Sequence, residues 1–548
     1  MKLPSRKNWG RRARRWPRAR CLGGSGFLQA VRAYGRYLAA LDPRSLACFR
    51  ILTGLVLLHD IGMAWESLDE WAGLQGYYDE LPLPVLPFAE DAVPTLALLF
   101  LAYGICGLAL LLGLFTRLST LAVWLLACGH QFAVRHTGDY HDLVLSTLLF
   151  WCLFLDLGQT CSVDAWRRRR RGRPAAAPGQ ACQPAAALLT LNVAYIYLCA
   201  VVLKTGSGWW QDGTAVLFAL KDFAMASDAG AWLAGQLPFV FFRAAAHLVV
   251  AVELVGPLLL LSLWRPATSR LLGCGLLLGF AVALWLLMDL EAFPLTMAAA
   301  VCALLPGRLW ERLPTLRLAD RVEEGAPTPV SRPALRRRSW LRLAMAAYLL
   351  INLEGHRIQH LEEEWPYPGA RALVSLQQAL GMELIWKMYA PEPREHAGWW
   401  VGVGITADGR EVDPITGRLP TLAPPSLKEP PFAGLGGLYW FEAPVEGGWP
   451  QHVYARYILW RDERQNPPER QLTHFLLLYM HEPFWPLQPA PHPARPLLVM
   501  RWPDDQQDPP PALAAGSLLC GLEMFAVEFG SLEKKGWQPQ RLPPLSTY

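Results

Sequence analysis

The stretch AALLTLNVAYIYLCAVVLK, residues 186–204, carries no charged residue before its final lysine. A helix rises about 1.5 Å per residue, so a helix of this length nearly covers the hydrocarbon core of a bilayer, which is about 30 Å thick. The segment therefore predicts a membrane-spanning helix. Lys204 ends it, where the apolar run gives way to TGSGWW.

Eight further apolar segments predict spans of the same kind. The nine segments are roughly 45–64, 95–115, 118–134, 141–158, 186–204, 239–263, 271–288, 292–306 and 339–355. Only 18% of all residues are charged, whereas soluble proteins carry about 25%. We therefore predict a mainly α membrane protein with a bundle of nine transmembrane helices.

The charges between the spans predict how the bundle is oriented. Residues 65–94 hold seven acidic residues and no Lys or Arg, whereas 167–171 is a run of arginines. Basic and acidic connections alternate in this way along the chain. Because basic loops stay on the cytoplasmic side, we expect a cytoplasmic N-terminus and an extracytoplasmic C-terminal region in the plasma or inner membrane.

Two polar regions flank the predicted bundle, which would occupy residues 44–355. Residues 1–43 are basic, and within them 27–41 places apolar side chains on one helical face. This pattern is typical either of a helix lying along the membrane surface or of one packed on protein.

The C-terminal region, residues 356–548, is predicted to form a β-rich extracytoplasmic domain. Residues 399–413 alternate around Asp408-Gly409, which is a strong hairpin signal. The other predicted strands are 452–460, 473–480 and 522–529.

Composition also excludes several classes of partner and cofactor. The net charge of +5 comes from basic runs beside apolar segments, which is typical of membrane orientation and not of nucleic-acid binding. The 11 cysteines include no C-x-x-C pair, and the 12 histidines show no ligand-spaced cluster. No metal site is predicted.

Charged residues inside the predicted spans are costly and are usually paired or functional. Arg50 and Asp60 lie about 15 Å apart along one helix, so each needs a partner elsewhere. Glu253 lies in mid-span, one turn before Pro257, and a lone buried carboxylate is either protonated or paired. A structural hydrogen bond to a neighbouring helix would equally explain Glu253.

Two further polar sites are predicted at the outer face. Tyr140, His141 and Asp142 open the fourth span, and Lys204 closes the fifth. The predicted topology puts His141 and Lys204 at the same depth, where they could share a pocket. A polar helix start and a snorkelling lysine beside Trp210 would explain the same residues without a pocket.

Four segments resemble the horizontally transferred transmembrane (HTTM) domain, the membrane module of vitamin K-dependent γ-glutamyl carboxylase and its bacterial relatives. They follow the family's order, and the likeness covers about residues 44–310. The segments are 50–60 (RILTGLVLLHD), 138–166 (which contains His141 and ends in Ser-Val-Asp-Ala-Trp), 195–213 (YIYLCAVVLKTGSGWWQDG) and 292–306 (AFPLTMAAAVCALLP).

The resemblance implies an enzyme that couples oxidation of a reduced quinone, such as vitamin K hydroquinone, to carboxylation of a glutamate. O₂ and CO₂ would be co-substrates, and the glutamate would belong to a peptide or protein at the outer face. Lys204 would be the base and His141 its helper. A desolvated lysine favours the neutral amine, which is the form that accepts a proton. The residues expected to shape the pocket are Arg50, Asp60, Tyr140, Asp142, Tyr197, Trp210 and Glu253.

Departures from the family leave other functions open. The carboxylase has adjacent lysines where this chain has only Lys204, and the spacing from this lysine to the following glycine also differs. The loop 65–94 lacks cysteines, so a disulfide found in the animal enzyme cannot form. The alternative is a non-catalytic HTTM scaffold, maturation factor or solute pathway. A third possibility is other chemistry on a peptide or lipid.

Overall fold

The computed structural model describes most of the chain between Tyr34 and Trp502. The described residues are 34–312 apart from 36, 67, 69–91, 134–139, 173–182 and 223–224, and then 347, 350–351, 354, 368–379, 388–423, 458–459, 461–484 and 495–502. The predicted ninth span, 339–355, lies almost entirely outside them.

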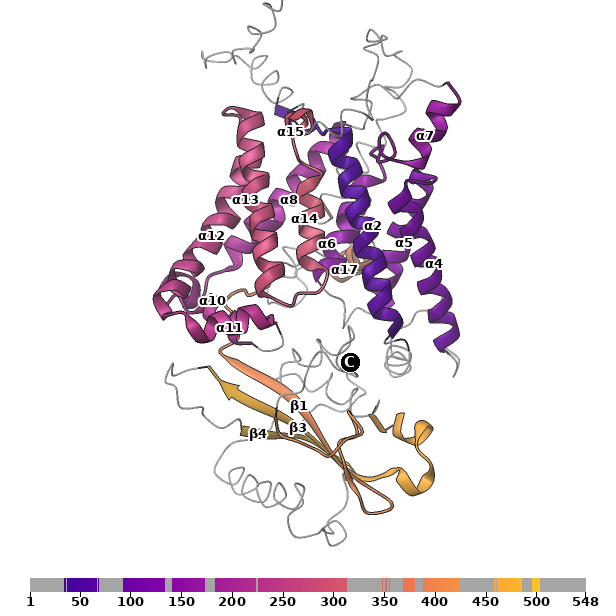
Figure 1. Ribbon diagram of the computed structural model, residues 1–548, viewed down its shortest axis with the longest axis vertical. Coiled ribbons are helices and arrows are strands. Elements are labelled where there is room, and N and C mark those ends of the chain that lie inside the picture. Colours follow the sequence, from indigo (N-terminus) through magenta and orange to yellow (C-terminus); the bar gives the residue numbers. More distant parts are fainter. Residues whose placement is uncertain are drawn as a thin grey trace, which may run out of the picture.

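The helices stand side by side in an upright bundle (Figure 1). Four contain stretches long and apolar enough to cross a membrane: α2 (Pro43–Glu66), α8 (Gln183–Leu203), α12 (Phe239–Leu261) and α13 (Pro266–Leu287). Four others coincide with predicted spans: α4 (Ala92–Leu112), α5 (Thr116–Ala133), α6 (Tyr140–Cys152) and α14 (Phe293–Cys302). The mainly helical membrane architecture is therefore supported, while the count of nine spans stays a prediction.

The bundle is held by apolar packing between helices distant in sequence. α2 packs on α4 and α14, and α12 packs on α8 and α13. Close approach requires Gly54 in α2, because a Cβ there would lie 2.8 Å from the Cα of Leu111. Large apolar side chains such as Val202 are exposed on the outside of the bundle, which fits contact with lipid.

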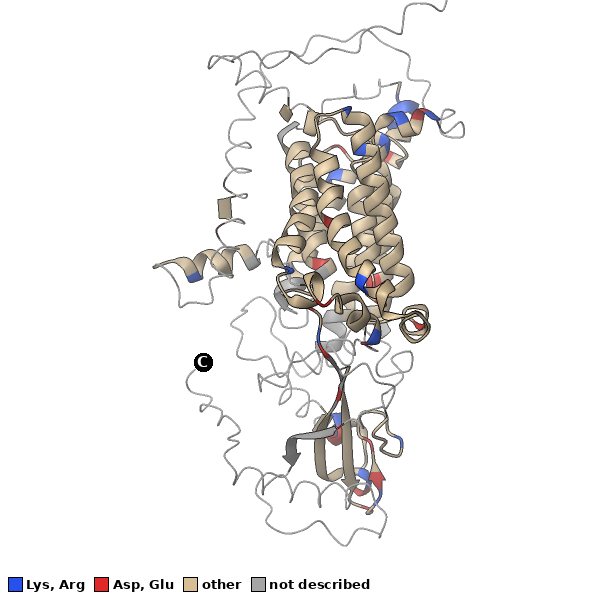
Figure 2. Ribbon diagram, turned by 90° about the vertical axis from the view of Figure 1, so that its left-hand side faces the viewer, with Lys and Arg blue, Asp and Glu red and all other residues tan. Residues whose placement is uncertain are grey.

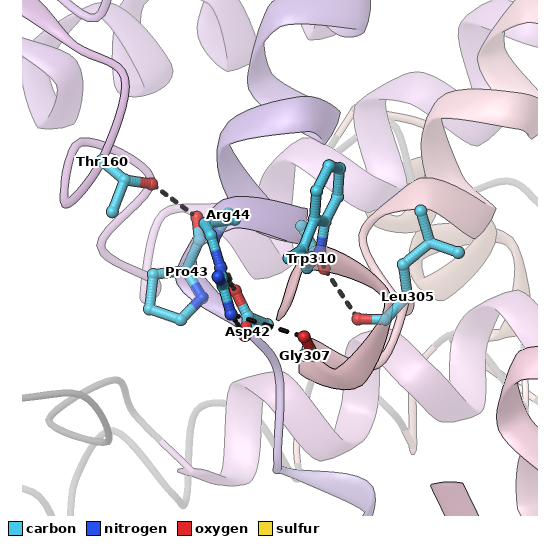
Figure 3. Close-up of polar contacts among 8 residues, drawn as sticks. Asp42, Pro43, Arg44, Thr160, Leu305, Gly307 and Trp310 are labelled. Atoms are coloured by element: carbon cyan, nitrogen blue, oxygen red, sulfur yellow. Dashed lines mark hydrogen bonds and ion pairs between the residues drawn. The ribbon is translucent and has the colours of Figure 1, made fainter. Parts of the chain in front are cut away.

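Polar contacts join the beginning and the end of the bundle. Arg44 pairs with Asp42 at 3.0 Å and donates to the carbonyl of Gly307 at 3.5 Å (Figure 3). The Ser45 hydroxyl donates to the carbonyl of Leu305 at 2.7 Å. These bonds connect the first turn of α2 to the chain after α14.

The described part of the predicted amphipathic segment packs on protein. The Tyr34 hydroxyl donates to the carbonyl of Leu261, and the Tyr37 hydroxyl to that of Leu260. Arg270 donates to the carbonyl of Ala40. Between the two roles considered for residues 27–41, these contacts favour a helix packed against α12 and α13.

A four-stranded antiparallel sheet lies beyond one end of the bundle, opposite the end that holds α7 (Val163–Arg170) (Figures 1 and 2). Its order is β2-β1-β3-β4. The strands are β1 (His396–Thr406), β2 (Glu411–Val412), β3 (Leu472–Pro483) and β4 (Arg495–Trp502). The predicted hairpin at Asp408-Gly409 and the strand at 473–480 are therefore both present. Whether the sheet belongs to an independent extracytoplasmic domain stays a prediction.

One predicted strand differs from the structure, and another lies outside the described residues. The strand expected at 452–460 is wrong at residues 458–459, which are helical. The chain then continues through a helical turn, where Arg461 donates to the carbonyl of Ile415 and Asp462 accepts from the amide of Leu472. The strand expected at 522–529 lies outside the described residues.

Candidate functional site

Lys204 and Glu253 form a buried ion pair between two helices. Lys204 directly follows the last residue of α8, and Glu253 lies in the middle of α12. The Lys204 Nζ lies 2.8 Å from one carboxylate oxygen of Glu253 and 3.0 Å from the other. Their side chains are only 4% and 7% exposed. Pro257 lacks the amide that would bond to the Glu253 carbonyl, so the helix is locally loosened beside the pair.

The pair lines an apolar cavity of about 500 Å³. Its walls come mainly from α10 (Ala215–Lys221), α12 and α13, with Tyr197 from α8 and with Phe293 and Met297 from α14. Most lining side chains are aliphatic or aromatic, and the Lys204 Nζ lies 5.0 Å from the centroid of the Trp209 ring. The arrangement places one amine and one carboxyl group in an otherwise largely apolar space.

Residues far along the chain complete this cavity. Met388 and Tyr389 lie in its wall, and the carbonyl of Tyr389 accepts a hydrogen bond from the Trp209 indole at 2.9 Å. The carboxylate of Glu392 accepts from the amide of Gly208 at 3.0 Å. The sequence does not predict these contacts, because each uses a backbone group and joins residues about 180 positions apart. The closely spaced glycines at 206 and 208 were the available signal, since glycine permits close backbone approach.

His141 lies in a second polar cluster, built by α2, α5 and α6. Its Nε2 is 3.2 Å from an oxygen of Asp60 and 3.5 Å from an oxygen of Asp142. Asp142 in turn lies 3.8 Å from His130, and Asp60 lies 3.3 Å from His59. His141 is not among the residues that line the Lys204 cavity. Its predicted role as helper of Lys204 stays a prediction.

The remaining predicted residues occupy other positions. Arg50 is fully buried and donates to the carbonyls of Leu110 and Leu111 at the end of α4, and to that of Cys161. Arg50 and Asp60 thus bind different elements, as their separation requires. The Trp210 indole donates to the carbonyl of Lys204.

Tyr140 is the first residue of α6. Within the described parts of the chain, no group of three or more His, Cys, Asp and Glu residues is placed to hold a metal ion.

A comparison with known protein families finds a match over this helical region. The sequence model of the HTTM domain covers residues 39–307. Residues 39–307 therefore form an HTTM domain. This family is related to the membrane domain of γ-carboxylases. No curated protein and no solved structure matches the chain.

The HTTM domain ends at a residue that joins the two ends of the helical bundle. Gly307, which accepts from Arg44, is the last matched residue. Both the Lys204–Glu253 pair and the His141 cluster fall inside the HTTM domain. Tyr389 and Glu392, which complete the cavity around Lys204, come from beyond it.

Proposed function

We propose that this HTTM protein is a membrane enzyme in which Lys204 removes a proton from a lipophilic substrate, a reduced quinone. The observation that carries the proposal is the position of the Lys204 amine in an apolar cavity, paired with Glu253. A non-catalytic scaffold predicts a lysine that reaches toward lipid headgroups. A lysine that is 4% exposed favours the enzyme.

The pair can provide a base without a change in its total charge. Its proton lies either on Lys204, giving two ions, or on Glu253, giving two neutral groups. The proposed reaction uses the arrangement with two neutral groups. With Glu253 holding the proton, Lys204 is a neutral amine that can accept one from a substrate hydroxyl.

The cavity fits a lipid-soluble ring that carries hydroxyl groups. Its volume of about 500 Å³ lies within the usual range of ligand pockets, roughly 300–1,000 Å³. Trp209, Phe280 and Phe293 supply aromatic walls, and the Lys204–Glu253 pair supplies polar contacts. A bound reduced quinone supplies the electrons for reduction of O₂, which in the related carboxylases drives addition of CO₂ to glutamate. The walls around Lys204 exclude water from this step.

The acceptor glutamate is proposed to approach from the side of the sheet. Met388 and Tyr389 line the cavity, and Glu392 bonds to the amide of Gly208. The chain then enters β1, which begins at His396. A peptide held near β1 would therefore lie next to the wall formed by Met388 and Tyr389.

The test is carboxylation by the purified full-length protein. The protein is supplied with a reduced naphthoquinone, O₂, isotopically labelled bicarbonate and candidate glutamate peptides, and mass spectrometry detects the gain of one CO₂ per modified glutamate. We expect product with the parent and none with Lys204→Ala. The matched control is Lys221→Ala at the end of α10, because Lys221 does not line the cavity. Equal product from Lys204→Ala and the parent would reject the proposal.

A further inference from the structure

The short helix α7 is fixed at the end of the bundle away from the sheet (Figure 1). Ser162 caps its first turn by accepting from the amide of Ala165 at 2.9 Å. The carboxylate of Asp164 accepts from the amides of Phe115 and Thr116, at 3.1 and 2.7 Å. These bonds hold α7 to the turn between α4 and α5, so its side chains project from a defined position.

Five consecutive arginines, Arg167 to Arg171, form the end of α7 and its cap. Arg168 donates to the carbonyl of Gly158. The guanidinium of Arg170 lies 4.1 Å from the Trp166 ring centroid, and that of Arg167 lies 5.2 Å from the Phe115 ring centroid. In the described part of the chain, Arg167, Arg170 and Arg171 form no ion pair with an acidic side chain. The positive charge is therefore available to a partner from outside the described part of the chain.

Apolar surface adjoins this positive charge. Trp166 is 51% exposed and Phe115 is 62% exposed. Trp166 also lines an open groove of about 510 Å³, together with Leu112, Cys161, Ser162 and Val163. Aromatic side chains next to arginines are typical of the level of lipid headgroups. Blue stretches of ribbon mark Lys and Arg at this end of the bundle in Figure 2.

We infer that α7 binds an anionic phospholipid, with the phosphate on Arg167, Arg170 and Arg171 and an acyl chain along the groove. A guanidinium suits this partner because its paired N–H groups match phosphate oxygens. A zwitterionic lipid carries a compensating cation, so the arginines favour a lipid with net negative charge. A free phosphate ester would leave the apolar groove uncovered. The site is separate from Lys204, which lies after the far end of α8.

The experiment measures which lipids the purified full-length protein retains from mixed micelles of phosphatidylglycerol and phosphatidylcholine, by native mass spectrometry. We expect the parent to prefer phosphatidylglycerol at least about tenfold. The variant Arg167→Gln/Arg170→Gln/Arg171→Gln should lose this preference. The matched control is Arg308→Gln/Arg312→Gln in α15 (Gly307–Arg312), which lies at the same end of the bundle. It should stay within about twofold of the parent.

Three results would overturn the inference: no preference in the parent, an equal loss in the control, or displacement of the lipid by millimolar glycerol phosphate. A salt titration of the parent decides the matter if the triple variant fails to fold. The preference should weaken as the salt concentration rises, because salt screens charges at the surface. A preference that does not change with salt would contradict binding through the arginines.

Discussion

The Lys204 Nζ lies 2.8 Å from Glu253, although the two residues are 49 positions apart and on different helices. Their contact joins the end of α8 to the middle of α12 at the wall of the apolar cavity. It explains why a lysine can directly follow the apolar helix α8 and a glutamate can lie in the middle of α12. It also gives the first prediction, since stability and activity should respond differently to loss of the pair.

Glu253→Leu should destabilise the protein by about 3–5 kcal/mol, because it removes one partner of a buried pair and leaves Lys204 without its carboxylate. The double variant Lys204→Met/Glu253→Leu should regain most of that stability but no carboxylation activity. Denaturant unfolding in detergent, followed by intrinsic fluorescence, measures the first effect. A double variant as unstable as Glu253→Leu would show that the pair is not what the substitution disrupts.

Gly279→Leu should weaken binding of a lipophilic ligand in the cavity at least about tenfold, because the new side chain would occupy part of a pocket of this size. Gly279 lines the cavity on α13, and a Cβ there meets nothing within 4 Å. Gly129→Leu on α5 is the matched control, since Gly129 is equally open and does not line the cavity. Equilibrium binding of a naphthoquinone is the measurement. Equal weakening by both variants would argue against this cavity as the site.

We expect His141 and Asp60 to stabilise the protein together. We do not expect His141 to contribute to ligand binding in the Lys204 cavity. His141→Gln and Asp60→Asn should show a coupling free energy of at least about 0.5 kcal/mol in a double-mutant cycle, because their side chains are 3.2 Å apart. His141→Gln alone should leave naphthoquinone affinity within about twofold, since His141 does not line the cavity. A much larger loss of affinity would place His141 in the ligand site after all.

Gly54→Ala should destabilise the bundle by about 1–3 kcal/mol, because its Cβ would overlap the backbone of Leu111. Gly62→Ala in the same helix is the control, because nothing lies within 4 Å of its added Cβ. That substitution should be neutral or stabilise by up to about 1 kcal/mol, through the higher helix propensity of alanine. Thermal unfolding of both variants in one detergent gives the comparison. Similar melting temperatures would contradict the close approach of α2 and α4.

Much of the fold follows from local patterns in the sequence. The first eight predicted spans each contain a helix, because apolar length is a local property that the bilayer requires. The hairpin at Asp408-Gly409 was also predictable, since Gly409 takes a φ of +80° that glycine accepts readily. β4 was missed, because RPLLVMRW has a proline and little alternation.

The candidate site was only partly predictable. Lys204 and Glu253 stood out because each is a charge in or directly after an apolar helix, but their contact depends on how α8 packs on α12. The predicted topology gives Lys204 and His141 the same depth, where they could share a pocket. Depth does not determine the position around the bundle, and His141 instead lies beside Asp60. The wall formed by Tyr389 could not be predicted, because its bond to Trp209 uses a backbone carbonyl.

The most direct test of Lys204 as the base is the rate of hydroquinone oxidation by the purified protein. Lys204→Ala should lower this rate by at least about a hundredfold, Lys221→Ala should leave it unchanged, and an added small primary amine should restore part of the activity of Lys204→Ala. An unchanged rate in Lys204→Ala would contradict the account.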